Sequence, residues 1–284
     1  LGIRWAARVV VPEGGVGFVE SGLGANRTVF TYIGRAHAVF EATEKMSESA
    51  LAYNDKRKHS GVHPRMGAVD VCPFVLLDDE KFQAVFLKAV DQFIEHMGTK
   101  GLPIYAYEHS ARKPSRRNLA HVRKGEYEQL PSRFAQGDIP DVGPKIWKDA
   151  AAKSGATAMG ARPLMVAFNV NLSGGSKNEL LVAAKQIARA IRERDGGLPG
   201  VKSIGWYIPD LDVVQVSCNL TKPLETGVCE VFQTVQQQAL ALGYLAPDSE
   251  LIGCIPEHQF NVCTPSTLGL GRFKPMIPDR ILPY

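Results

Sequence analysis

The residue types best suited to chemistry lie together in residues 59–74, a glycine-containing loop that leads into an apolar run. His63 can accept and donate a proton near neutral pH, and Pro64 biases the residue before it toward extended backbone. Arg65 offers a planar pair of donors that can bind a carboxylate. A proton-transferring side chain two residues from an anion-binding one predicts group-transfer chemistry on a small acidic substrate. Enzymes commonly hold catalytic groups on such loops beside a buried strand.

The second half of the chain alternates predicted strands and helices. Apolar residues recur at helical spacing in two segments, and apolar runs bounded by turn residues indicate four strands. The order is β-α-β-β-α-β, the split arrangement of a ferredoxin-like layer. The predicted strands are 164–172, 203–208, 213–220 and 250–255, and the predicted helices are 180–191 and 225–242.

The first half shows a similar order without its beginning, β-β-α-β-α-β, where a complete copy would start with one more strand and helix. We therefore expect an α/β (α+β) fold of two ferredoxin-like lobes, 1–163 and 164–284, with a ligand cleft between them. The predicted strands of the first half are 16–20, 28–33, 67–77 and 103–107, and the predicted helices are 36–54 and 81–97.

Residues 108–161, between the predicted lobes, are interpreted as a polar, irregular connector rich in arginine and lysine. A connector of this length in a compact protein is usually functional or mobile. Small residues in 154–162 would let the backbone approach a ligand closely. Arg116 and Arg117 are expected on a solvated face.

Composition and charge narrow the functional classes. The chain has 284 residues, 45% hydrophobic and 22% charged, with a formal net charge of +4. These values are typical of a soluble globular protein, and the mild positive charge fits small anionic ligands better than nucleic acid. No apolar stretch is long enough to span a membrane. The five cysteines show no metal-ligand spacing, and their odd number and apolar surroundings predict reduced thiols, a cytoplasmic location and no metal.

The motif in residues 59–74 closely resembles the signature of glutamate formiminotransferases. Further segments resemble the same family in the same order, and together the likeness covers roughly residues 16–256 with high specificity. It concerns the transferase part of formiminotransferase-cyclodeaminase alone. The other matching segments are 25–31, 115–117, 125–128, 155–157 through 168–169, 205–207 and 215–220.

The resemblance implies a cytoplasmic, homodimeric enzyme of histidine degradation and one-carbon metabolism. It would transfer a formimino group from N-formiminoglutamate to tetrahydrofolate, its co-substrate, with no metal. His63 would be the catalytic acid and base. Arg65 and Arg27 could bind substrate carboxylates, and Glu20 could orient His63 or stabilise the cationic amidine. Asn26 would either bind substrate or cap its turn. The alternative to a solvated face for Arg116 and Arg117 is contact with a polyglutamate tail. The folate-binding residues carried over are Gly143, Pro144, Lys145, Ile146, Trp147, Ser154 and Gly155.

Two departures from the family pattern keep a second function open. The family begins with a strand and helix for which residues 1–11 have no equivalent, and residues 257–268 are short where the family has a long helix. We expect that the corresponding family segments are missing from this sequence, as they would be after the loss of exons or in an incomplete gene model. The alternative is a catalytically inactive relative that binds folate or forms dimers. A hydrolase using Cys72 as nucleophile is a third reading, although an apolar run predicts a core residue there.

Overall fold

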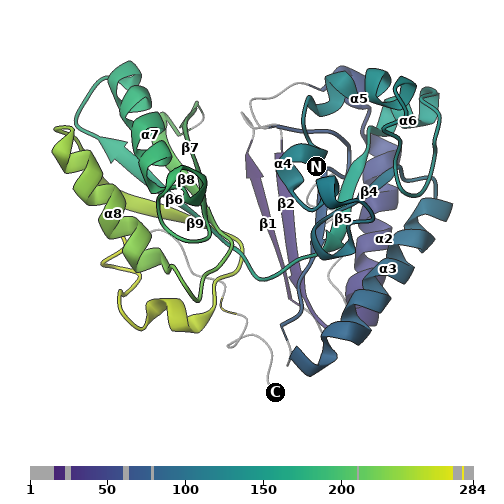
Figure 1. The fold of residues 1–284 in the computed structure, drawn as a ribbon, viewed down its shortest axis with the longest axis horizontal. Helices are drawn as coiled ribbons and strands as arrows, with labels where there is room; N and C mark the ends of the chain where they lie inside the picture. Colours follow the sequence, from purple (N-terminus) through teal and green to yellow (C-terminus); the bar gives the residue numbers. More distant parts are fainter. Residues whose placement is uncertain are drawn as a thin grey trace. The chain divides into compact units, whose positions relative to one another are not determined.

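The computed structural model describes residues 16–22, 27–59, 64–77, 80–209, 211–270 and 277. The chain divides between Pro163 and Leu164 into two compact units, each with a sheet and helices of its own (Figure 1). The fold is mixed α and β: a three-stranded parallel sheet and a two-stranded sheet precede a four-stranded antiparallel sheet.

The first unit contains a parallel sheet with strand order β3-β5-β4, and β1 pairs with β2 in a separate sheet. This differs from the ferredoxin-like layer expected for the first half, because the central strand comes from a segment in which no strand was predicted. The strands are β1 (Val16–Gly22), β2 (Arg27–Ile33), β3 (Val71–Phe74), β4 (Ile104–Ala106) and β5 (Thr157–Ala161). The helices are α2 (Ala36–Tyr53), α3 (Gln83–Thr99), α4 (Leu119–Val122), α5 (Glu126–Ala135) and α6 (Asp149–Ser154).

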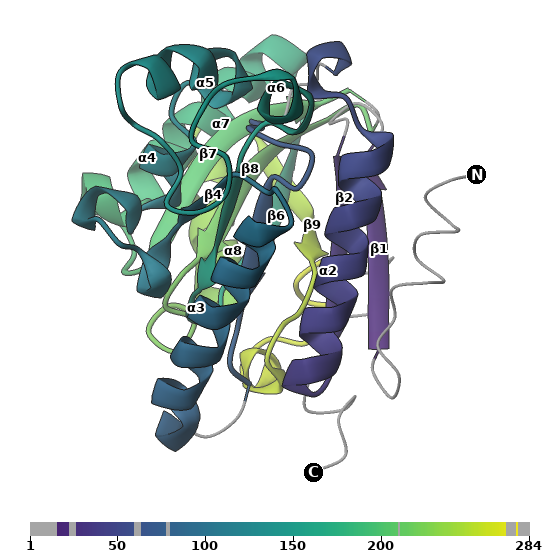
Figure 2. The ribbon, with the colours of Figure 1, turned by 90° about the vertical axis from the view of Figure 1, so that its right-hand side faces the viewer.

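Helices α2 and α3 lie side by side, as Figure 2 shows. Phe40 of α2 stacks on Phe93 of α3 with ring centroids 4.7 Å apart, and both rings meet the edge-on ring of Phe74 from β3. Such aromatic contacts add to the free energy gained by burying the rings. This cluster packs β3 against both helices and supports the strand that follows the loop of interest.

The interpretation of residues 108–161 as an irregular connector is wrong. The segment forms α4, α5 and α6 and ends in β5, whose five residues are all buried. Three of the five residues of β5 are alanine or glycine, which have little intrinsic strand preference, and this is why the strand was missed. Its small residues accommodate neighbouring backbone, since a Cβ on Gly160 would lie 2.3 Å from the Tyr107 carbonyl oxygen.

The expectation that Arg116 lies on a solvated face is also wrong. Its side chain is only 5% exposed and binds Asp141 at 2.6 Å and Asp138 at 2.8 Å. Its guanidinium lies 4.6 Å from the centre of the Tyr105 ring, within range of a cation–π interaction. Arg117 is exposed. Two carboxylates of the protein therefore neutralise the charge of Arg116. Through these ion pairs and the Tyr105 ring, Arg116 connects residues 138–141 to β4.

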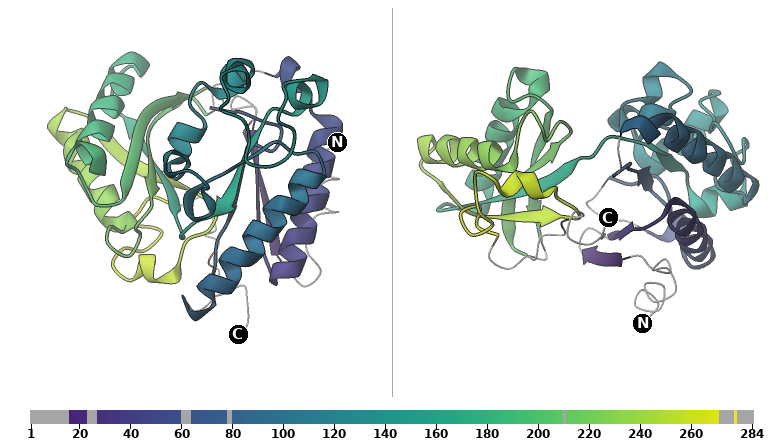
Figure 3. Two further views of the ribbon diagram at one scale, coloured as in Figure 1. Left: turned by 45° about the vertical axis from the view of Figure 1, so that its right-hand side comes forward. Right: turned by 90° about the horizontal axis from the view of Figure 1, so that it is seen from below.

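The second unit has the predicted order β-α-β-β-α-β, and its sheet has strand order β7-β8-β6-β9 with every pair antiparallel. Figures 1 and 3 show both helices on one face of the sheet, where they bury the apolar core of the unit. The elements are β6 (Val166–Ser173), α7 (Lys177–Ile191), β7 (Val201–Ile208), β8 (Val213–Leu220), α8 (Val228–Ala241) and β9 (Leu245–Ile252).

The last strand begins earlier than predicted, at Leu245, and contains Pro247. Proline cannot donate to a neighbouring strand and is tolerated at a sheet edge. Because β9 lies at the edge of the sheet, Pro247 does not interrupt it.

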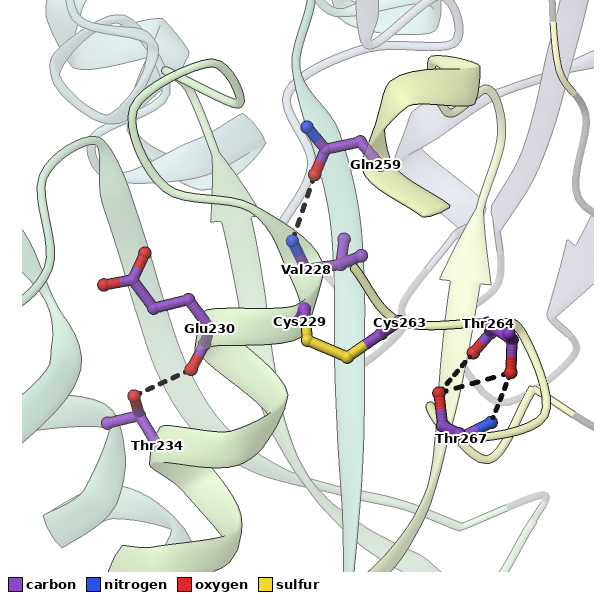
Figure 4. The surroundings of a disulfide bond; sticks show 8 residues. All are labelled: Val228, Cys229, Glu230, Thr234, Gln259, Cys263, Thr264 and Thr267. Atoms are coloured by element: carbon purple, nitrogen blue, oxygen red, sulfur yellow. Dashed lines mark hydrogen bonds between the residues drawn. A yellow bond between two sulfur atoms is a disulfide. The ribbon is translucent and has the colours of Figure 1, made fainter. Parts of the chain in front are cut away.

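The expectation that all cysteines are reduced is wrong for two of them. Cys229 in the first turn of α8 is bonded to Cys263 (Figure 4). The side-chain oxygen of Gln259 also accepts a hydrogen bond from the Val228 amide at 3.0 Å, so the segment after β9 is joined to α8 twice. Neither the odd count of cysteines nor their apolar neighbours reveals which pairs meet in space. The cytoplasmic inference loses the support that it took from reduced thiols.

Candidate functional site

The candidate site is the signature loop, defined here as residues 64–70, with the side chains that contact it. His63, Asn26 and the side chain of Glu20 lie outside the described residues. Arg27, Arg65 and the predicted folate segment are described. The loop precedes β3, as a polar loop before a buried strand was predicted to do, but its strand is shorter than expected, since residues 67–70 bend before Val71.

Asp70 is the centre of a network that fixes this loop. Its carboxylate accepts hydrogen bonds from Arg27 at 2.9 Å, from Arg123 at 2.6 Å and from the Met66 amide at 2.8 Å. Arg123 donates to the carbonyl of Pro64 as well. Burial lowers the pKa of Arg123, while the charge of Asp70 opposes that shift. One carboxylate therefore joins β2, the loop and the end of α4, and it restrains the backbone next to His63.

The side chain of Arg65 binds carboxylates of the protein itself. Its guanidinium binds Glu128 at 2.6 Å and Glu126 at 3.5 Å, and donates to the His59 carbonyl at 3.0 Å. The Arg65 carbonyl in turn accepts from the Tyr127 amide. The hydrogen bond to Arg65 lowers the pKa of Glu128, and the same bond raises the pKa of Arg65. Arg65 thus binds the first turn of α5 to the loop.

Residues 154–156 form the other side of the loop. Ala156 donates to the Met66 carbonyl at 2.9 Å, and Ala68 donates to the Ser154 carbonyl at 2.7 Å. The two backbones approach each other directly, without side chains between them. The candidate site is therefore held by helices α4 and α5 on one side and by the α6–β5 connection on the other.

Gly67 is required by this close approach, so Gly67→Ala is expected to destabilise the protein. A Cβ there would lie 2.1 Å from the Ala156 carbonyl oxygen, on backbone that cannot rotate away. Overpacking of this kind costs about 1–3 kcal/mol. Urea denaturation of both proteins measures the difference in the free energy of unfolding. A variant as stable as the wild type would contradict the contact.

The predicted folate segment is divided between exposed and buried residues. Lys145 and Ile146 are exposed, and Trp147 packs against Phe134 with ring centroids 5.2 Å apart. Ser154 and Gly155 are buried, and the Ser154 hydroxyl donates to the carbonyl of Gly155. The remaining two residues, Gly143 and Pro144, are half-buried.

No role was predicted for Arg123, Glu126 or Glu128, although all three contact the loop. The concentration of arginine and the Gly-Glu-Tyr-Glu motif were the available signals. Long-range ion pairs have no periodicity, so the partners could not be assigned from spacing alone.

Cys72 fits a core residue better than a nucleophile. Burial raises the pKa of its thiol to about 12, so little thiolate is present at neutral pH. Burial also raises the pKa of the Cys218 thiol in β8 to about 12.

A second polar cluster crosses the sheet of the second unit. Trp206 donates to Gln215 at 3.1 Å, and Gln215 donates to Asn171 at 2.8 Å and to Glu250 at 3.1 Å. Asn169 also donates to Glu250. Because side chains alternate along a strand, this row lies on the face opposite the helices. Three of these residues lie in the motifs singled out from the sequence; Glu250 and Asn171 were missed.

Two kinds of feature are absent from the described ranges. No helix there is long and apolar enough to cross a membrane. No three histidine, cysteine or acidic side chains there are grouped to hold a metal ion.

Comparison with known proteins identifies the family. The sequence profile of the formiminotransferase domain, N-terminal subdomain, matches residues 9–162, and that of the formiminotransferase domain matches residues 167–264. The chain belongs to the formiminotransferase family. Resemblance in the signature segments had predicted this family, and the prediction is confirmed.

Individual members of the formiminotransferase family are similar to this chain over most of its length. Glutamate formimidoyltransferase of Streptococcus pyogenes serotype M1 is 38% identical over 233 residues, which cover 81% of this chain and 75% of the relative. The Thermoplasma acidophilum protein of the same name is 35% identical over 242 residues, covering 84% and 77%. Formimidoyltransferase-cyclodeaminase of Rattus norvegicus is 35% identical over 246 residues, but this chain spans only 44% of its length.

Proposed function

We propose that this protein is a glutamate formiminotransferase that transfers a formimino group from N-formiminoglutamate to tetrahydrofolate, with His63 as the catalytic acid and base. The observation that supports it best is the network in which Arg123 and Asp70 restrain Pro64, the residue after His63. A catalytic group needs such restraint to act at a fixed position. Family membership and the two glutamate formimidoyltransferase relatives supply the reaction class.

In the proposed reaction a folate nitrogen attacks the amidine carbon, and a new carbon–nitrogen bond forms. His63 takes the proton that this nitrogen loses. The bond between the amidine carbon and the glutamate nitrogen then breaks, and His63 gives its proton to the departing amine. One imidazole suffices, because its ordinary pKa of about 6.5 allows both steps near neutral pH.

The proposal divides the predicted folate segment by exposure. Lys145, Ile146 and Trp147 would contact folate, whereas Ser154 and Gly155 would support the loop, to which their backbone is joined. We further propose that the protein is a homodimer, as the family resemblance implies. The second unit would be a ferredoxin-like lobe, supported by its strand order β7-β8-β6-β9.

A transfer assay tests the function. Purified protein with N-formiminoglutamate and tetrahydrofolate is expected to form 5-formiminotetrahydrofolate and glutamate in equal amounts, measured by absorbance and by mass spectrometry. Folded protein that binds folate without transfer would instead support the catalytically inactive relative. Omission of tetrahydrofolate is the control, since formimino loss without an acceptor would be hydrolysis.

A further inference from the structure

Lys56 is a buried cation to which the proposed mechanism gives no role. It begins the 3-10 turn Lys56–Lys58 shortly before the signature loop, and only 8% of the residue is exposed. Arg57 and Lys58 of the same turn are exposed. Lysine is almost never buried to this extent unless its charge is paired.

The Lys56 ammonium has no carboxylate within ion-pair distance among the residues that the structure describes. The acidic side chains around it bind other cations. Asp55 pairs with Arg57 at 2.7 Å, Glu128 with Arg65 at 2.6 Å, and Asp70 with Arg123 at 2.6 Å and Arg27 at 2.9 Å.

The surroundings of Lys56 place it at the candidate site. Arg65 donates to the carbonyl of His59, the residue that ends the same turn. Burial lowers the pKa of Lys56, and the charge of Arg65 lowers it further, while Asp70 and Glu128 oppose the shift. The described carboxylates of the site, Asp70, Glu126 and Glu128, bind Arg27, Arg65 and Arg123, and none of them pairs with Lys56.

We propose that Lys56 binds a carboxylate of the substrate, which supplies the partner that no described carboxylate provides. This rests on the proposed function, whose two substrates both contain glutamate. An ammonium group donates in three directions and so suits a carboxylate that approaches from solvent. Arg65 has acceptors of the protein on both terminal nitrogens, whereas Lys56 has none among the described residues.

Steady-state kinetics of Lys56→Met test the proposal. Methionine keeps the unbranched, apolar part of the side chain and removes the ammonium group. The KM for one glutamate-containing substrate is expected to rise about 10- to 100-fold, the loss of a hydrogen bond to a charged group, with kcat nearly unchanged. The substrate whose KM rises, N-formiminoglutamate or tetrahydrofolate, is the source of the carboxylate. Lys58→Met, on the exposed side of the turn, is the matched control and should change neither value.

A melting experiment separates binding from a structural role. Removal of an unpaired buried charge should raise the melting temperature of ligand-free protein by about 2–4 °C, while stabilisation by the substrate identified above should fall relative to wild type. Unchanged KM values for both substrates, or a Lys56→Met variant that is less stable or unfolded, would overturn the proposal. Wild-type protein without transfer activity would refute the proposed function instead. The melting shifts with each substrate would then still decide whether Lys56 binds it.

Discussion

Replacing His63 by alanine is expected to lower kcat for formimino transfer by about 10²- to 10⁴-fold, the usual contribution of general acid–base catalysis. The KM values should change little, since the imidazole moves protons and does not bind the carboxylates. Stopped-time assays of purified wild type and His63→Ala, with product measured by mass spectrometry, cover this range.

Two further measurements make the result specific to proton transfer. His121 on α4 is an exposed imidazole of the same unit, so His121→Ala should keep wild-type kcat. Free imidazole should partly restore the activity of His63→Ala, because it can enter the space of the missing ring. Retention of at least a tenth of wild-type kcat by His63→Ala would reject this residue as the acid and base.

The position of the signature loop before a strand was predictable from the sequence, whereas the contacts that hold the loop were not. A glycine-containing polar loop before an apolar run is a local pattern, and the loop does lie before β3. Its restraint depends on Arg123 and Glu128, which follow Asp70 and Arg65 by more than fifty positions. Nothing in local spacing indicates that these charges meet.

The predicted anion-binding arginine shows the same limit. A guanidinium next to a histidine has the chemistry to bind a substrate carboxylate, and sequence alone offers no competitor for it. In the structure the carboxylates of Glu126 and Glu128 form ion pairs with Arg65 and occupy its guanidinium. Lys56 is buried and has no ion-pair partner among the described residues, and this could be recognised only after burial and contacts were known.

The second unit was predicted well because its signals are strong and local. Helix α7 begins with a capping box, in which Ser176 and Glu179 satisfy each other's backbone, and its buried residues recur at helical spacing. Strand β5 has no such signals. Its place in the sheet depends on parallel pairing with β3 and β4, which are distant in sequence.

The prediction of largest effect on stability concerns Asp70. Asp70→Ala is expected to lower the free energy of unfolding by about 3–5 kcal/mol, because it leaves the guanidinium of Arg123 partly buried without its carboxylate. Both side chains of this pair are only 13% exposed, so water replaces the lost partner poorly. Arg27 and the Met66 amide lose the same acceptor. Urea denaturation followed by circular dichroism measures the change.

The matched control is an ion pair on the surface. Glu41 and Lys45 pair at 2.6 Å on α2, with side chains 63% and 50% exposed, and such pairs contribute little. Glu41→Ala should therefore unfold at nearly the wild-type urea concentration, whereas Asp70→Ala should not. Equal stability of the two variants would mean that Asp70 does not hold the signature loop. The restraint on Pro64, from which the role of His63 is argued, would then have to come from elsewhere.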